Sequence, residues 1–139
     1  MYEEKINAYF DAPERRAELV EAISRLVRIR SVREEPLPGM PFGPGPAAAL
    51  AEGLKLAEEL GFATRNYDNY VGTADLNDKE TALHILCHLD VVGEGTGWTV
   101  TEPYAPKEVD GMLYGWGTDD DKGPVAAVLL AMKAVKELG

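Results

Sequence analysis

The sequence has few of the residues that stabilise secreted proteins or bind nucleic acids. Cys87 is the only cysteine in 139 residues, so no disulfide can form within the chain, and a reducing cytoplasm is the expected location. Basic residues are also scarce, because 14 lysines and arginines stand against 24 acidic residues, for a net charge of −10. This balance disfavours nucleic acid as a partner, since binding to phosphate groups requires clustered basic side chains.

Long apolar runs are also absent. None approaches the roughly 18 residues that a membrane-spanning helix needs. The first residues, MYEEKINAYF, have neither the basic start nor the apolar middle of a signal peptide. We therefore expect no membrane partner. With 45% hydrophobic and 27% charged residues, the composition is that of one globular domain.

The spacing of apolar residues predicts an α/β domain whose sheet is flanked by helices. Helices are expected over roughly the first ten residues and from Pro13, Pro46 and Pro124 onward, because proline suits the first turn of a helix. In the last of these, Val125, Val128, Leu129, Met132 and Val135 are predicted to form one apolar side.

The segments between these helices are rich in turn formers or in strand-forming residues. Residues 34–46 contain five prolines and are predicted to be an ordered loop in which Met40 and Phe42 are apolar anchors. Two strands are expected at residues 62–67 and 70–76.

A third strand is predicted over residues 81–92, TALHILCHLDVV, and it should be buried on both faces because the apolar run is nearly continuous. Alternation along a strand puts His88 and Asp90 on the same side, with Cys87 on the other as a small buried hydrophobe. A carboxylate there can accept one ring N–H of the histidine and leave the other nitrogen free for a metal. Taken alone, this tripeptide is more simply explained as a hydrogen-bonded histidine at a strand end.

Three consecutive carboxylates, Asp119 to Asp121, lie in the turn GWGTDDDKGP. A calcium-binding EF-hand loop would need oxygen ligands at its fifth and twelfth positions, where this chain has Gly123 and Leu130. A phosphate site is unsuitable because carboxylates repel phosphate. A helix N-terminus accounts for one or two acids. The remaining option is a cation bridged by a carboxylate.

In this order, CHLDVV, a glycine-rich loop and DGMLYGWGTDDDKGP resemble the M20 family of co-catalytic zinc peptidases, and most closely its PepV-like dipeptidases. The stretches PFGPGPAAAL and RNYDNYVG are similar to the corresponding parts of that subfamily, so the resemblance spans nearly the whole chain. It implies a zinc-peptidase-like α/β fold, with residues 1–139 as the N-terminal part of the catalytic domain. The rest of that domain and a lid domain are expected to be absent.

The resemblance also implies roles for single residues. His88 is expected to bind one metal, and Asp90 to act as the catalytic residue that orients and polarises His88. Asp120 is expected to bridge two zinc ions, for which manganese or cobalt are possible substitutes. Asp121 follows across a peptide bond that is typically cis in the family, and Asp119 is given no ligand role.

Some positions depart from the family pattern or match none of its ligands. Trp116 stands where relatives usually have arginine, and Gly93 where they often have proline. His84 is expected to be a packed or surface histidine. Trp98 and Tyr104 are expected to pack their loop onto the core rather than to line a substrate pocket.

The family mechanism uses two metals that activate a bridging water, with a glutamate as general base. Glu137 is the only acidic residue after Asp121, so the base and the remaining ligands are not supplied. We expect the chain alone to bind zinc weakly, to hydrolyse no dipeptide and to expose or self-associate through the face that missing strands would cover. The alternatives are a non-catalytic fragment, pseudoenzyme or interaction module of the same fold, and a clan relative acting on N-acyl amino acids.

Overall fold

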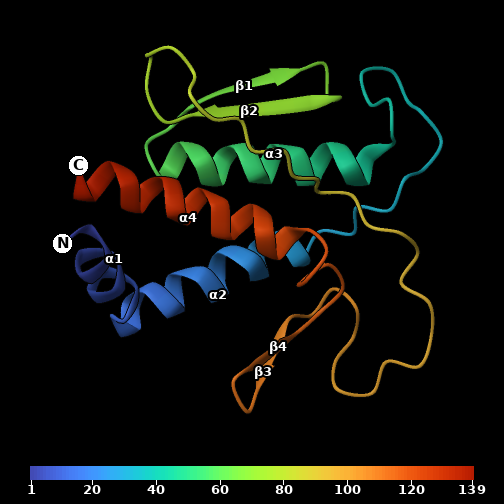
Figure 1. The fold of residues 1–139 in the computed structure, drawn as a ribbon. Coiled ribbons are helices and arrows are strands. Elements are labelled where there is room, and N and C mark those ends of the chain that lie inside the picture. Colours follow the sequence, from blue (N-terminus) through green and yellow to red (C-terminus); the bar gives the residue numbers. More distant parts are fainter.

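Four helices and two small hairpins make up the chain in a computed structural model that describes residues 1–139 (Figure 1). The elements are α1 (Tyr2–Phe10), α2 (Pro13–Val27), α3 (Pro44–Glu59), β1 (Ala63–Tyr67), β2 (Val71–Asp75), β3 (Lys107–Val109), β4 (Met112–Tyr114) and α4 (Lys122–Leu138). Helix α2 packs against both α3 and α4, and α1 packs beside the first turns of α2 and the end of α4 (Figure 1).

The hydrophobic core lies where α2, α3 and α4 meet. Its buried members come from all three helices and from the residues that follow α3: Ala22, Leu26, Leu56, Ala57, Phe62, Ala126 and Leu129. Strands β1 and β2 form an antiparallel hairpin over another face of α3 (Figure 1). Gly72 permits this contact, because a Cβ atom there would lie 2.8 Å from the side chains of Leu50 and Leu54.

The α/β class and all four predicted helices are confirmed. Helix α3 begins at Pro44 and α4 at Lys122, each two residues before the predicted start. Pro46 and Pro124 still lie in the first turn of their helices, where a backbone N–H has no partner within the helix and is not missed. One residue of the predicted apolar side of α4 is misplaced: Val135 is exposed, and small residues such as Ala126 and Ala134 face the core. No helix combines the length and apolar character needed to cross a bilayer.

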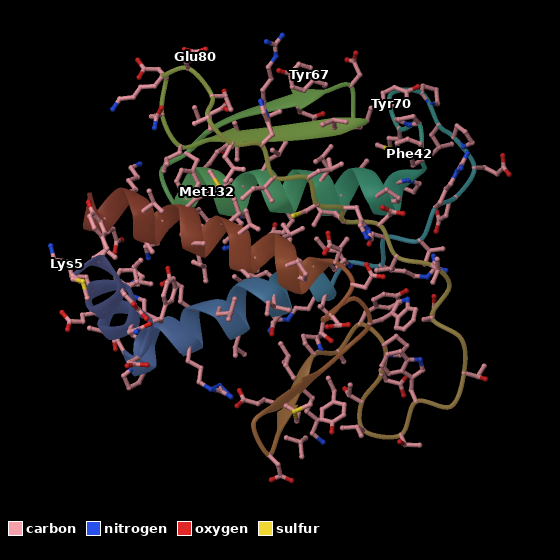
Figure 2. All side chains as sticks on the ribbon, in the orientation of Figure 1. Lys5, Phe42, Tyr67, Tyr70, Glu80 and Met132 are labelled. Carbon is pink, nitrogen blue, oxygen red and sulfur yellow. The ribbon has the colours of Figure 1, made fainter.

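The proline-rich loop before α3 is ordered, as predicted. Leu37 pairs with Met40, and the backbone N–H of Glu34 donates to the Phe42 carbonyl. The ring of Phe42 packs edge-on against Tyr70, with 5.5 Å between their centroids, and this contact joins the loop to the end of the hairpin (Figure 2).

The predicted buried strand at 81–92 is wrong. Residues 81–90 form no β pairing, and the only bridge in this region joins Val91 to Val32. Leu83 and Leu86 are 74% and 93% exposed. A strand requires hydrogen-bonded neighbours, and no other segment of this chain provides them. The run was predicted to be buried because it is apolar, but within these 139 residues its side chains remain exposed.

This exposed run predicts self-association, because unpaired backbone groups beside apolar side chains offer a template for a second chain. Leu86→Lys should shift the chain toward monomer in sedimentation velocity, and it should leave the fold intact because Leu86 packs against nothing. Met112→Lys, at a 62% exposed position on β4, is the matched control and should not change the distribution. A wild type that stays strictly monomeric at high concentration would contradict this prediction.

Candidate metal centre

His88, Asp120 and Asp121 are brought together by two segments that lie far apart in the sequence. His88 Nε2 lies 2.9 Å from Asp120 Oδ1, and the backbone N–H of His88 donates to Asp121 Oδ2 over 2.9 Å. One ligand atom from each of these residues lies within 4.8 Å of the others. The segment before Val91 and the turn before α4 therefore form a single polar cluster.

Asp90 lies on the opposite side of the His88 ring. His88 Nδ1 is 3.1 Å from the Asp90 backbone carbonyl and 3.4 Å from Asp90 Oδ1. The prediction was that the Asp90 carboxylate accepts one ring N–H of His88, whereas the closer acceptor is the backbone carbonyl of the same residue. Either acceptor favours a proton on Nδ1, and this leaves Nε2 as the nitrogen that can bind a cation.

The pKa of His88 is raised. Desolvation by burial lowers this pKa, but the hydrogen bonds to the Asp90 carbonyl and the Asp120 carboxylate outweigh it, because both favour the charged ring. Without a metal, both ring nitrogens face acceptors. A cation at Nε2 must therefore displace a proton that these acceptors stabilise, so binding will weaken as the pH falls.

The turn before α4 is shaped by close backbone contacts. The peptide bond between Asp120 and Asp121 is cis, as the resemblance implied. Gly123 must lack a side chain, because a Cβ atom there would lie 2.0 Å from the Thr118 carbonyl oxygen. Asp119 is exposed and lies outside the cluster of possible ligands.

The donor set fits a divalent metal. One imidazole nitrogen and two carboxylates are ligands that zinc and neighbouring borderline cations accept. The side chains of His88 and Asp120 are 51% and 83% exposed, so the cluster is open to solvent. A closed zinc site has four ligands, whereas this cluster offers three ligand-bearing residues.

Two completely buried polar residues, Ser31 and Lys122, lie behind this cluster. Ser31 Oγ donates to the Leu89 carbonyl over 2.6 Å, and the Ser31 carbonyl accepts from the backbone N–H of Val91. Lys122 Nζ donates to the Ile29 carbonyl over 2.6 Å. Neither residue was predicted from the sequence.

Burial lowers the pKa of Lys122 from 10.5 to about 8, because the charged ammonium is disfavoured away from water. The ammonium group forms no ion pair, and its hydrogen-bond partner is the neutral carbonyl of Ile29. The sequence carried one signal for this position. Lys122 and Ala126 are spaced by one helical turn on the side of α4 that faces the core.

Trp116, which replaces the usual arginine, joins the two halves of the site without adding a charge. Its indole Nε1–H donates to the Val92 carbonyl over 2.7 Å, and its backbone N–H donates to the Pro103 carbonyl. Its ring packs edge-on against Trp98 at 5.8 Å. Hydrogen bonding and stacking therefore hold the glycine-rich loop next to the aspartate turn.

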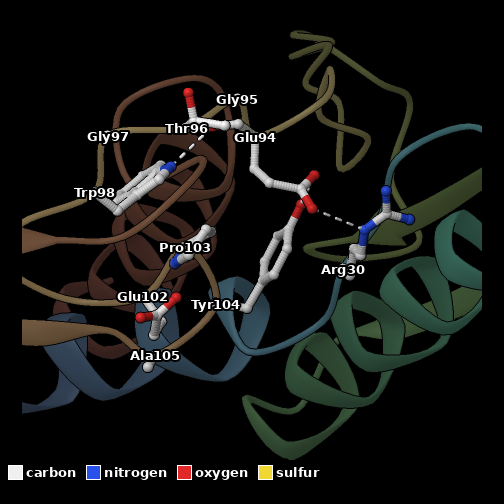
Figure 3. Close-up of a pocket in the computed structure, with 10 residues that line it drawn as sticks. All are labelled: Arg30, Glu94, Gly95, Thr96, Gly97, Trp98, Glu102, Pro103, Tyr104 and Ala105. Atoms are coloured by element: carbon white, nitrogen blue, oxygen red, sulfur yellow. Dashed lines mark hydrogen bonds and ion pairs between the residues drawn. The ribbon is translucent and has the colours of Figure 1, made fainter.

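The loop after Val92 lines a shallow cavity of about 600 Å³ (Figure 3). In it, Glu94 pairs with Arg30 at 3.3 Å and accepts from the Tyr104 hydroxyl, while Trp98 Nε1–H donates to the Glu94 carbonyl. Trp98 and Tyr104 themselves line this cavity, and their hydrogen bonds go to Glu94 of the same loop, so the predicted packing onto the core is not what the structure shows.

The other two residues considered from the sequence lie outside the cluster. His84 is exposed, in keeping with a surface histidine. Cys87 was expected to be buried, but its side chain is only partly covered, because the segment that carries it has no neighbouring strand. Desolvation nevertheless raises the pKa of the Cys87 thiol.

The segment that contains this cluster is similar to known proteins. Residues 84–139 match the family described as Peptidase family M20/M25/M40. Three similar proteins are each named as a putative dipeptidase: YtjP of Bacillus subtilis, SSP1012 of Staphylococcus saprophyticus and a protein of Staphylococcus epidermidis. They are 37%, 36% and 34% identical over 89%, 99% and 99% of this chain, and the chain spans 27%, 28% and 28% of their lengths.

The low pKa of Lys122 predicts that stability depends on pH. Between about pH 8 and pH 10.5 the unfolded chain binds this proton while the folded chain loses it, so stability rises with pH in that window. The rise should reach up to about 3 kcal/mol, at about 1.4 kcal/mol for each pKa unit. The measurement is urea unfolding of the wild type and of Lys122→Met at about pH 7.5 and at about pH 9.5. The wild type should gain stability relative to the variant, and equal changes in both would disprove the assignment.

Proposed function

This chain belongs to the M20 peptidase family, and from that premise we propose that it is the N-terminal, metal-binding portion of a two-zinc dipeptidase that hydrolyses the peptide bond of dipeptides. The observation that carries the proposal is the cluster of His88, Asp120 and Asp121, whose donor atoms lie within 4.8 Å inside the segment that matches the family. The relatives named as dipeptidases support the substrate class.

The chain's own groups divide the work in this proposal. His88 offers Nε2 to a metal and keeps its other proton on Nδ1, toward Asp90. Asp120 presents an exposed carboxylate that can be shared between two cations. Asp121 holds the backbone of His88 through its Oδ2 atom. Metal ions held by these residues would supply Lewis-acid chemistry and would lower the pKa of a coordinated water.

The proposal includes inactivity of the chain alone. A general base must lie within hydrogen-bond reach of the attacking water. Glu137, the one acid after Asp121, lies at the other end of α4, roughly 24 Å away at about 1.5 Å per residue. It also bonds to the Tyr9 hydroxyl and Arg15. The base and the remaining ligands must therefore come from outside these residues.

The test is zinc binding by the purified chain, measured by competition with a chromogenic chelator. We expect weak binding by the wild type and its loss in His88→Ala and Asp120→Asn, because the first variant removes the imidazole and the second replaces an anionic carboxylate with a neutral amide. Asp119→Asn is the matched control, since it removes a neighbouring charge outside the cluster, and it should bind like the wild type.

The same samples should hydrolyse no dipeptide. Turnover that remains with the wild-type chain through purification, and that is abolished by a chelator and by His88→Ala, would refute the proposed inactivity. It would also show that these residues supply a base that the structure does not place near the site.

A non-catalytic module of the same fold is the second candidate, and the exposed apolar run around Leu86 favours it as a surface for contact with another chain. Zinc binding separates the two readings. A module whose site has no metal role would bind zinc no more tightly than His88→Ala does. A clan relative acting on N-acyl amino acids would share the metal site and differ only in the substrate of the complete enzyme.

A further inference from the structure

We propose that Ser31 and Lys122 are positioning residues, which hold the two ligand-bearing segments of the metal centre against one short stretch of backbone after α2. Ser31 holds the segment that carries His88 and Asp90, and Lys122 holds the turn that carries Asp120. The inference rests on the metal role proposed above and adds to it the two buried side chains that set the spacing of the ligands.

The first contact acts on Leu89, which lies between His88 and Asp90. The Ser31 hydroxyl donates to its carbonyl over 2.6 Å, and the backbone of Ser31 accepts from Val91. The Leu89 side chain lies against α3, where a Cβ atom at Gly53 would be 2.9 Å from its Cδ1 atom. The Leu89 residue is therefore held on both sides, and the two flanking side chains are oriented with it.

The second contact acts on the aspartate turn. Lys122 follows Asp121 directly, and its Nζ donates to the Ile29 carbonyl. Its backbone N–H donates to the Gly117 carbonyl, and its side-chain stem lies along the same glycine, 3.2 Å from where a Cβ atom would be. The start of α4 is thereby attached to the residues that follow α2.

Both contacts end on Ile29 and Ser31, which are separated by one residue. The segments around His88 and Asp120 are thus both hydrogen-bonded to the same short stretch after α2, although they are not paired with each other as strands. Two contacts link them directly: the His88 backbone N–H donates to Asp121 Oδ2, and His88 Nε2 lies 2.9 Å from Asp120 Oδ1. A change at Ser31 or Lys122 should therefore move one ligand relative to the other.

Stability alone does not explain a lysine at this position. Its side chain is completely buried, it forms no ion pair, and its only acceptor is a neutral carbonyl. Burying a charge in this way costs free energy, and an apolar residue of similar length would cost less. A role in placing the aspartate turn accounts for a long donor that reaches a carbonyl beyond the core.

The test uses the 139-residue chain with Ser31→Ala, Lys122→Met and the double variant. Zinc affinity, measured by chelator competition, should fall about 10-fold to 100-fold in each single variant, the range typical of residues that orient metal ligands. The double variant should lose less than the product of the two, because both contacts support one geometry. Urea unfolding should show Lys122→Met to be no less stable than the wild type.

A second readout requires no metal. The backbone amide of His88 donates to Asp121 Oδ2, so its NMR shift and its protection from hydrogen exchange report the spacing of the two segments. Both should change in Ser31→Ala and in Lys122→Met. Phe62→Leu is the control, because it weakens the core beside Lys136, at the opposite end of α4 from the aspartate turn, and it should leave the His88 amide shift and the zinc affinity of the folded chain unchanged.

The outcomes separate this inference from the proposed function. If the wild type binds zinc through His88 but Ser31→Ala and Lys122→Met bind equally well with an unchanged His88 amide, the inference is overturned and the proposed function stands. If the wild type binds no zinc, the proposed metal role fails, and the amide readout alone then decides whether the two side chains set the spacing.

Discussion

The packing of α4 against α2 is the contact on which the rest of the structure depends. Leu26 and Ala126 are completely buried in the same core, and this contact brings the first turn of α4 to the end of α2. The aspartate turn precedes α4, and the residues after α2 accept hydrogen bonds from the segment of His88 and from Lys122. A helix–helix contact made by apolar residues thus determines where two polar segments meet.

No lysine or arginine forms an ion pair with the aspartates of the cluster, and the only such partner of Asp120 is His88. The arginines of α2 are engaged elsewhere: Arg25 joins α2 to α3 through Glu52 and Glu59, and Arg15 pairs with Glu18. These partly exposed pairs contribute little to stability. In a chain with a net charge of −10, Asp120 and Asp121 remain a local excess of negative charge, and a divalent cation would reduce it.

Residues 81–92 include both His88 and several exposed apolar side chains. These side chains are exposed because no neighbouring strand covers them, and His88 is half exposed for the same reason. The chain spans little more than a quarter of the length of its dipeptidase-named relatives. The absence of a paired strand beside residues 81–90 therefore accounts for both the exposure of His88 and the exposed apolar side chains.

The sequence by itself determined the helices, the ordered proline loop and the family, and it named His88, Asp120 and Asp121, which the structure brings together. Each of these is local, since it depends on apolar spacing, on proline and glycine positions, or on short motifs such as His88-Leu89-Asp90. Tertiary structure alone decided that residues 81–90 are unpaired, that the Asp90 carbonyl is the closer partner of His88, and that Ser31 and Lys122 lie behind the site. The physical reason is that strand pairing, burial and hydrogen bonds between distant residues depend on which segments are present to supply partners.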